Sequence, residues 1–231
     1  PCRNERGNVE QAVKRCPDMG DYTEIIFIEG HSKDNTYEEI ERVANLYPEK
    51  NIKYSRQDGI GKGDAVRKGI RMATGDILMI QDADLTAPPE ELPKFYEAIV
   101  AGKGEFINGS RLVYGMESDA MRFLNLIANH GFAVLFSWTL GQKVKDTLCG
   151  TKVLFKKDYD LIEANRDFFG DFDPFGDFDL LFGAAKLNRK IVDMPVKYKN
   201  RTYGTSQISR FSAGVLLLRM HILSIIKFKL R

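Results

Sequence analysis

The sequence is poor in cysteine and histidine, the residues that build many metal sites and covalent catalytic sites. Its 231 residues include three cysteines and three histidines. The cysteines lack metal-ligand spacing, and we interpret Cys2, Cys16 and Cys149 as free thiols in a reducing compartment. The histidines are scattered along the chain, so the sequence indicates no Ser/His/Asp or Cys/His arrangement for nucleophilic catalysis.

An excess of charge of one sign is also missing. The 34 basic and 32 acidic residues give a formal net charge of +2. Such a balance creates no strong field, so we do not expect nucleic acid as a partner. With 43% hydrophobic and 29% charged residues, the composition is that of an ordinary globular domain.

Short apolar runs alternate with helical stripes along the chain. We predict strands at residues 24–28, 51–55, 77–80, 105–107, 152–155 and 191–198. Helices are predicted between them, and Thr36 with Glu39 fits a capping box at the start of one. Alternation of strands and helices with short connections predicts an α/β fold: a three-layer α/β/α sandwich around a mostly parallel central sheet.

The start of the chain departs from this pattern. A doubly wound domain is expected to begin with a strand, but the first predicted element is a helical stripe at residues 8–16. No apolar run precedes it, and the first residue is Pro1 rather than methionine. We therefore expect the first strand of the sheet to be missing from this chain.

Two carboxylates follow the most apolar of the predicted strands. Residues 77–80 lead directly to Asp82 and Asp84, at the carboxyl end where open α/β sheets place their ligands. Two acidic groups set so close are most easily held ionised by a cation, and oxygen ligands suit Mg²⁺ or Mn²⁺. The alternative is a simple turn, because aspartate is common in turns and Pro88 and Pro89 follow.

Basic residues beside small or polar neighbours form a second candidate group. Lys62 lies in a Gly-Lys-Gly sequence that opens a helix, where free backbone N–H groups favour an anion. The motif is neither a Rossmann nor a Walker sequence, which argues against nicotinamide binding and ATP hydrolysis. Arg111, Arg122 and Arg201 carry guanidinium forks that suit diphosphate oxygens. The alternatives are a surface turn at Lys62 and surface salt bridges for the arginines.

Asp177 and Asp179 form a second acidic pair, at the start of a predicted helix. One interpretation is a general base or a carboxylate that orients an acceptor. The other is that acidic residues near a helix N-terminus stabilise the helix dipole.

The C-terminal segment is apolar but interrupted by charge. Residues 211–231 contain Arg219, His221 and Lys227, so the segment does not suit a membrane-spanning helix of about 20 uncharged residues. We expect an amphipathic helix that lies in the membrane interface, or one that packs on the domain or on another subunit. The predicted division is a domain at 1–207 and this helix at 208–231.

Taken together, the motifs resemble those of family 2 glycosyltransferases of the GT-A fold. The similarity is greatest to polyprenyl-phosphate sugar transferases of the dolichyl-phosphate mannose synthase type. The matching stretches follow one another in the family's order, at residues 1–5, 29–36, 61–63, 82–84, 109–111, 146–150, 178–181 and 201–206. Two positions depart from the pattern, because Glu29-Gly30 stands where many relatives have Asp-Asp, and Thr86 where mannose synthases often have Gln.

The resemblance implies a role for each candidate residue. The donor, a nucleotide-diphosphate sugar, would be bound by Asn4, Glu5, Glu29, Lys62, Asp82 and Arg111. A metal, Mg²⁺ or Mn²⁺, would be held by Asp82 and Asp84 and would act as a Lewis acid on the leaving group. The acceptor or its phosphate would be bound by Arg122, Arg201 and Ser206, and the catalytic carboxylates would be Asp84, Asp177 and Asp179.

The function implied is a metal-dependent, inverting transfer of a hexose from a GDP-mannose or UDP-glucose type of donor to a polyprenyl phosphate. We expect the protein at the cytoplasmic face of the membrane, bound peripherally. A polyprenyl phosphate is already anionic and needs no strong base, whereas a hydroxyl acceptor would require Asp177 or Asp179 to take its proton. The alternatives are transfer to a hydroxyl of a glycan or cell-envelope precursor, and a non-catalytic nucleotide-sugar-binding scaffold.

Overall fold

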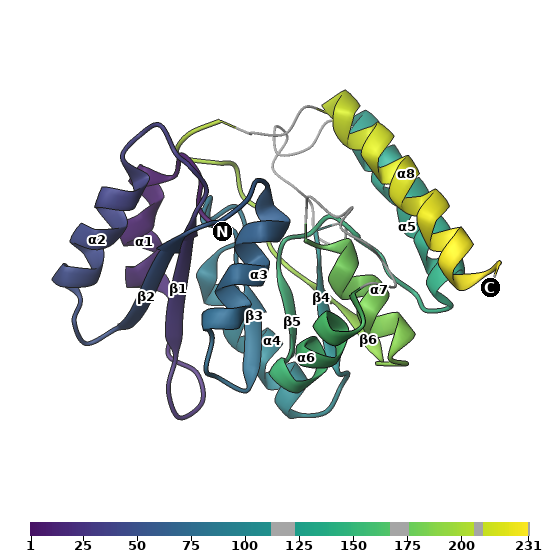
Figure 1. Ribbon diagram of the computed structural model, residues 1–231, viewed down its shortest axis with the longest axis horizontal. Coiled ribbons are helices and arrows are strands. Elements are labelled where there is room, and N and C mark those ends of the chain that lie inside the picture. Colours follow the sequence, from purple (N-terminus) through teal and green to yellow (C-terminus); the bar gives the residue numbers. More distant parts are fainter. Residues whose placement is uncertain (112–122, 167–175, 206–209, 231) are drawn as a thin grey trace.

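The computed structural model describes residues 1–111, 123–166, 176–205 and 210–230 (Figure 1). Strands and helices alternate through most of the chain, as predicted. In order, the elements are α1 (Arg6–Arg15), β1 (Glu24–Glu29), α2 (Thr36–Leu46), β2 (Asn51–Arg56), α3 (Lys62–Met72), β3 (Ile77–Ile80), the 3₁₀ turn η1 (Pro89–Glu91), α4 (Leu92–Val100), β4 (Phe106–Ser110), α5 (Phe123–Leu140), β5 (Lys152–Phe155), α6 (Lys156–Ala164), α7 (Phe178–Lys186), β6 (Ile191–Pro195) and α8 (Arg210–Phe228).

The described strands form two sheets. β1 and β2 make a parallel pair, and the other four strands are ordered β3-β5-β4-β6. β5 runs antiparallel to both β3 and β4, whereas β4 and β6 are parallel. The predicted α/β class is confirmed, but the sheet is mixed. The prediction of a mostly parallel sheet missed the reversal of β5, because residue patterns along a strand do not record its direction.

Helices cover both faces of the four-stranded sheet. Alternate residues of a strand point to opposite faces, and β3 shows this clearly. Leu78 and Ile80 join the apolar cluster that includes α3, α6 and α7, whereas Ile77 and Met79 pack against the cluster that includes α4. α1 and α2 share a third cluster with β1 and β2. The result is the predicted three-layer sandwich.

The predicted capping box at α2 is wrong. The helix begins after Asn35, which makes no capping hydrogen bond with its side chain. The Thr36 hydroxyl accepts the backbone N–H of Glu5 at 3.0 Å and donates to the carboxylate of Asp34. The Thr36 side chain, which the local pattern assigns to capping the helix, is therefore used in a tertiary contact with the N-terminal loop.

α5 and α8 lie side by side at one end of the molecule (Figure 1). Their inner faces belong to the same core, with Phe136 and Leu140 from α5 and Leu217 and Met220 from α8. The ring of Phe136 meets that of His221 edge-on, with centroids 5.2 Å apart. Among the helices described, none is both long and apolar enough to cross a membrane.

Candidate functional site

Asp82 lies at the centre of a cluster of alternating charges. The Lys62 ammonium, at the first residue of α3, is 2.8 Å from Asp82 Oδ1 and 3.9 Å from Asp177 Oδ2. The buried Lys152 ammonium lies 3.4 Å from the other oxygen of Asp177 and donates to the Cys149 carbonyl at 2.5 Å. Two lysines and two aspartates, from four separate segments, thus neutralise one another.

Gly150 allows this cluster to close. A Cβ added there would collide with the Asp82 carboxylate and lie 2.9 Å from Lys62 Nζ. The backbone of the loop before β5 therefore packs directly on the Asp82–Lys62 pair, and only glycine leaves room for that approach.

The electrostatics keep the Asp82–Lys62 pair ionised. Burial would lower the pKa of the Lys62 ammonium, but the carboxylates of Asp177 and Asp82 outweigh it, and the pKa is raised. Burial acts in the opposite direction on Asp82, where the positive charge of Lys62 outweighs it and holds the pKa of the carboxyl below its usual value. Both groups are therefore charged near neutral pH.

Asp84 has a different set of partners. Its Oδ2 is 2.7 Å from Arg201 Nη2, and its Oδ1 accepts the Thr86 hydroxyl at 2.7 Å and the Thr86 N–H at 3.0 Å. The other prong of the Arg201 guanidinium is paired with Glu5. Glu5 is buried and also accepts from Asn8 at 2.7 Å. Burial raises the pKa of the Glu5 carboxyl against the influence of Arg201.

The chain makes a tight turn at these aspartates, as the alternative interpretation of the acidic pair predicts. The backbone N–H of Leu85 donates to the Asp82 carbonyl at 3.3 Å, and Leu85 has a φ of 55°. The two interpretations of the acidic pair are therefore compatible, since a tight turn after β3 sends one carboxylate to Lys62 and the other to Arg201.

Three of the residues predicted to bind the donor, Asn4, Glu5 and Glu29, are brought together in one loop cluster. The Asn4 N–H donates to Ser32 Oγ at 2.8 Å, and Asn4 Oδ1 accepts the Lys33 N–H at 2.8 Å. Glu29, which is buried at the end of β1, accepts the Ser32 N–H at 2.5 Å. The N-terminal loop with Glu5 therefore lies against the loop after β1.

Arg111 is held in a two-pronged ion pair. Its Nε and Nη2 lie 2.8 and 2.9 Å from the two oxygens of Asp146, which also accepts the Arg111 N–H at 3.1 Å. Burial would raise the pKa of Asp146, but Arg111 outweighs it and the pKa is lowered. Contact of Arg111 with a donor phosphate remains a prediction.

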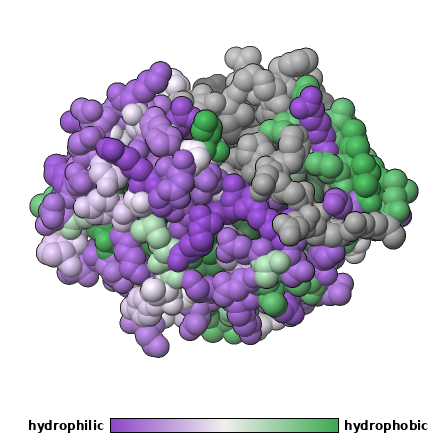
Figure 2. All heavy atoms as spheres, viewed as in Figure 1, coloured by the Kyte–Doolittle hydropathy of each residue, from purple (hydrophilic) through white to green (hydrophobic). Residues whose placement is uncertain are grey.

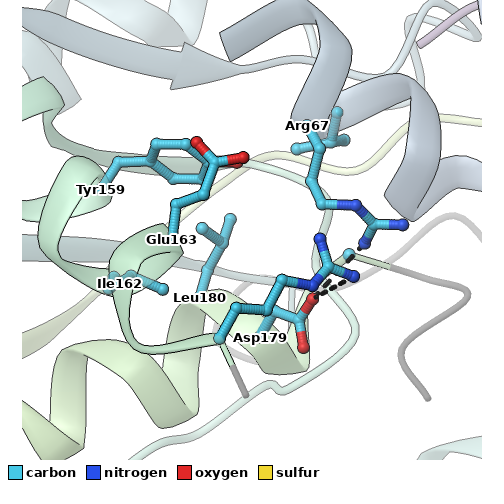
Figure 3. Close-up of a pocket in the computed structure, with 9 residues that line it drawn as sticks. Arg67, Tyr159, Ile162, Glu163, Asp179 and Leu180 are labelled. Carbon is cyan, nitrogen blue, oxygen red and sulfur yellow. Dashed lines mark hydrogen bonds and ion pairs between the residues drawn. The ribbon is translucent and has the colours of Figure 1, made fainter. Parts of the chain in front are cut away.

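Asp177 and Asp179 point to different places. Asp177 is the N-cap residue of α7, yet its side chain makes no capping hydrogen bond and turns to the two lysines instead. Asp179 lines a small pocket between α3, α6 and α7 (Figure 3). There its carboxylate lies 3.4 Å from Arg67 Nη1 and 3.7 Å from Arg166 Nη2.

The donors present fit a divalent metal that arrives with a phosphate ligand. The part of the chain that the structure describes contains no group of three or more His, Cys, Asp or Glu side chains placed to hold a metal. Mg²⁺ commonly uses only one or two protein carboxylates and takes its other ligands from water and substrate phosphates. Asp82 and Asp84 are the pair that we predict for this role, and the Asp82 side chain is 35% exposed.

Sequence comparison places this arrangement in a family. The sequence profile of glycosyl transferase family 2 matches residues 1–161. The chain belongs to glycosyltransferase family 2. It is 30% identical over 214 residues to a dolichol-phosphate mannosyltransferase of Pyrococcus furiosus, covering 90% of this chain and 57% of that protein. It is 33% identical over 125 residues to the Saccharomyces cerevisiae dolichol-phosphate mannosyltransferase, covering 52% of this chain and 45% of that protein. The chain thus spans about half the length of these relatives.

Solved structures with a similar fold agree with the architecture. Glucosyl-3-phosphoglycerate synthase of Mycobacterium tuberculosis superimposes with a TM-score of 0.63 at 16% identity, over 99% of this chain and 78% of that one. A complex of the same enzyme with Mn²⁺, UDP and glucosyl-3-phosphoglycerate gives a TM-score of 0.63 at 18% identity, with 99% and 77% coverage. At such identities the likeness establishes the fold.

For this family 2 chain, most of the residues predicted from the sequence lie within the two charge clusters or the adjoining loop. Arg111 and Asp179 have their own separate ion pairs. Arg122 and Ser206 lie outside the described residues. Their predicted roles in binding the acceptor phosphate therefore remain predictions.

Sequence reasoning missed Lys152. Its side chain is fully buried within β5 and balances Asp177. The signal was present, because a lysine opening the apolar strand Lys-Val-Leu-Phe must find a partner if it is buried.

Proposed function

We propose that this chain is the catalytic domain of a metal-dependent, inverting hexosyltransferase. The proposed donor is a nucleotide-diphosphate sugar and the proposed acceptor is a polyprenyl phosphate. The observation that carries the proposal is the pair Asp82 and Asp84 at the end of β3, each held by a basic side chain. A diphosphate with its metal can take the place of these internal partners, because it offers both a cation for the carboxylates and anions for Lys62 and Arg201.

The names of similar proteins support the choice of substrates. Two relatives are named dolichol-phosphate mannosyltransferases, which favours mannose and a polyprenyl phosphate. A structural neighbour crystallised with Mn²⁺ and UDP favours a nucleotide-bound sugar and a divalent metal. GDP-mannose and UDP-glucose, with Mg²⁺ or Mn²⁺, are therefore the first conditions to test.

The reaction needs little acid–base chemistry. An oxygen of the acceptor phosphate forms the new bond to the anomeric carbon, and the bond from that carbon to the nucleoside diphosphate breaks with its electron pair going to the diphosphate. A divalent cation held by Asp82 and Asp84 would neutralise the charge of this leaving group. Lys62 and Arg201 would add positive charge on the same side.

Asp177 then acts through Lys62 rather than as a base. Its carboxylate lies between Lys62 and Lys152, and this position fixes the direction in which the Lys62 ammonium points. An anionic acceptor has no proton to lose, so the proposed chemistry does not require a free carboxylate at this position. Asp84 would hold the metal, and Asp179 would stabilise the neighbouring pocket.

The outer faces of α5 and α8 support contact with a membrane. Large apolar side chains there are exposed, and the region appears as a continuous apolar surface over α8 (Figure 2). They are Val134, Leu135, Trp138, Val215, Leu218, Ile222, Ile226 and Leu230. The Lys229 ammonium lies 5.4 Å from the Trp138 ring, so a cation and an aromatic ring occupy one edge, as in interfacial helices. We propose that this surface docks on the cytoplasmic face of the membrane and that residues 208–231 serve as the anchor of the 1–207 domain.

A donor screen tests the transfer reaction. The protein is offered GDP-mannose or UDP-glucose with Mn²⁺ or Mg²⁺, with and without a short polyprenyl phosphate, and the released nucleoside diphosphate is measured. Release that requires both metal and lipid phosphate supports the proposal. Release that ignores the lipid favours a hydroxyl acceptor such as a glycan. The scaffold alternative gains support if calorimetry detects donor binding without any release.

Vesicle sedimentation tests the docking surface. Wild-type protein should sediment with anionic vesicles, and Ile222→Glu should weaken this binding about tenfold or more, because it places a charge on the apolar face. Leu161→Glu on α6 is the matched control, since Leu161 and Ile222 are 45% and 49% exposed. Equal binding by all three proteins would contradict the assignment, and concentration-dependent association without vesicles would favour a subunit interface.

A further inference from the structure

After β6, residues 196–205 cross the molecule as a strap that has neither helix nor strand (Figure 1). The strap passes the turn after β3, where the Lys199 N–H donates to the Thr86 carbonyl at 2.8 Å. It then carries Arg201 to the two carboxylates that the guanidinium joins. The place of Arg201 in the candidate site therefore depends on what holds this irregular segment.

The ring of Tyr203, two residues beyond Arg201, lies against the first turn of α1. Gly7 is the second residue of that helix, and a Cβ added to it would collide with the ring, with two ring atoms at 2.8 Å. Glycine is less favourable than alanine within a helix, so a glycine at this place needs a reason. The ring supplies it, because only a residue without a side chain allows so close an approach.

The Tyr203 hydroxyl ties the strap to the loop before α2. It donates to the Asp34 carboxylate at 3.2 Å. Burial would raise the pKa of the Asp34 carboxyl, but hydrogen bonds from the Thr36 hydroxyl, the Arg6 N–H and Tyr203 outweigh it, and the pKa is lowered. Asp34 is therefore an ionised acceptor, and hydrogen bonds to ionised groups are stronger than those between neutral groups.

The contacts of Tyr203 also lead back to Glu5. The Thr36 hydroxyl, which donates to Asp34, accepts the Glu5 N–H at 3.0 Å. The Glu5 carboxylate in turn is paired with Arg201. Arg201 and Tyr203 thus fix the same short piece of strap to the same N-terminal segment, one through an ion pair and the other through its ring and hydroxyl.

We propose that Tyr203 is a positioning residue for the transfer reaction: it fastens the strap to α1 so that the Arg201 guanidinium stays beside Asp84, where the donor diphosphate would bind. The inference rests on the proposed function, since it takes the donor of that reaction as the ligand of Arg201. Tyr203 acts through Arg201 rather than on the substrate. The alternative is a structural role, in which the ring stabilises α1 and donor binding does not depend on it.

Gly7→Ala tests the proposal without changing the strap. The added methyl group displaces the Tyr203 ring, while alanine favours the helix over glycine. We expect the midpoint of thermal unfolding to stay within about 3 °C of the wild-type value. KM for the donor should rise about fivefold, with kcat within about twofold of wild type. Gly131→Ala on α5 is the matched control, because a Cβ there meets nothing within 4 Å.

Variants of Tyr203 examine the same contact from the strap. Tyr203→Ala should raise KM for the donor about fivefold, as Gly7→Ala does. Tyr203→Phe keeps the ring and loses only the bond to Asp34, so its KM should be intermediate. The double variant Gly7→Ala with Tyr203→Ala should have the KM of Tyr203→Ala alone, since the methyl group then has no ring to displace. A further increase in the double variant would overturn the proposal.

Amide hydrogen exchange distinguishes failure of this inference from failure of the proposed function. Without ligand, the Lys199 N–H should exchange about fivefold faster or more in Gly7→Ala and Tyr203→Ala than in the wild type or Gly131→Ala, because the strap is loosened. If no donor is used, the proposed function fails, and unchanged exchange at Lys199 would overturn the fastening as well. If transfer occurs, a lower kcat with unchanged KM in both variants would assign Tyr203 a structural role and overturn the inference alone.

Discussion

Asp82 and Asp84 are two residues apart but belong to two different kinds of environment. Asp82 joins a network anchored on regular elements, with Lys62 at the start of α3, Asp177 at the start of α7 and Lys152 in β5. Asp84 joins a network built from loops, with Arg201 after β6 and Glu5 before α1. We infer from this anchoring that the first network is the more rigid and that the second adjusts when a ligand binds.

The two networks also differ in net charge. The Asp82 network holds two ammoniums and two carboxylates and is neutral, whereas the Asp84 network sets one guanidinium against two carboxylates. An additional cation is more easily accommodated beside the second. A metal would thus meet a fixed carboxylate at Asp82 and a negatively charged, adaptable group at Asp84.

The largest expected effect comes from removing the fixed carboxylate. Asp82→Asn should lower turnover with donor and acceptor by about 10²–10³-fold, because it removes the charge of a proposed metal ligand where the leaving group develops charge. Initial-rate measurement of nucleoside diphosphate release checks this. Asp160→Asn, an exposed position on α6, is the control and should keep wild-type activity.

Removing Lys152, the fully buried lysine of the Asp82 network, should lower the free energy of unfolding. Lys152→Met leaves Asp177 buried with one cation fewer, and losing one member of a buried pair costs about 3–5 kcal/mol. Urea unfolding should show this decrease. A loss below about 1 kcal/mol would mean that Lys62 alone balances Asp177, and the contrast between the two networks would disappear.

A substitution in the loop network of Asp84 should weaken donor binding more than it lowers the stability of the fold. Arg201→Lys keeps the charge but cannot reach Asp84 and Glu5 with two prongs at once. We expect KM for the donor to rise about tenfold, while the free energy of unfolding falls by about 1 kcal/mol because the pair is partly exposed. If stability fell as far as in Lys152→Met, the loop network would be as rigid as the other.

The smallest expected effect is on how the free energy of unfolding depends on pH. The folded-state pKa of Glu5 lies above its usual 4.5 because of burial, so its contribution to stability is greatest below pH 4.5 and is lost as pH rises through the raised value. Asp82 has a lowered pKa, and its contribution is lost as pH falls below 3.8. The stability of Glu5→Gln relative to wild type should therefore increase between pH 4 and pH 7, by about 1 kcal/mol or less. Unfolding curves at both values measure the sign, and a decrease would contradict the assignment.

Much of the fold was predictable because it depends on local patterns. Apolar runs and helical stripes gave the order of elements, although the predicted strand at 191–198 ends at Pro195 in the structure. The reversal of β5 and the pairing of α5 with α8 were not predictable in this way. Both depend on which element packs beside which, and no single stretch of sequence carries that information.

The sequence could predict which residues form the candidate site, but not how they pair with one another. Asp82 and Asp84 could be found because they follow a buried strand, and Lys62 because it opens a helix. Asp177 and Asp179 look equivalent in the sequence, yet one turns to Lys62 and Lys152 and the other to Arg67 and Arg166. Residues two apart at the start of a helix point to different sides, so their separation follows from α7 itself. Which basic side chains each one meets depends on the tertiary structure.

The central claim is that the two aspartates act together on one metal bound with the nucleoside diphosphate. Calorimetric titration of Mn²⁺ into the protein with GDP or UDP present tests it most directly, comparing wild type with Asp82→Asn and Asp84→Asn. We predict one binding event in the wild type that either substitution weakens by about tenfold or more. Wild-type affinity in either variant would show that the two carboxylates do not share a metal, and would contradict the account.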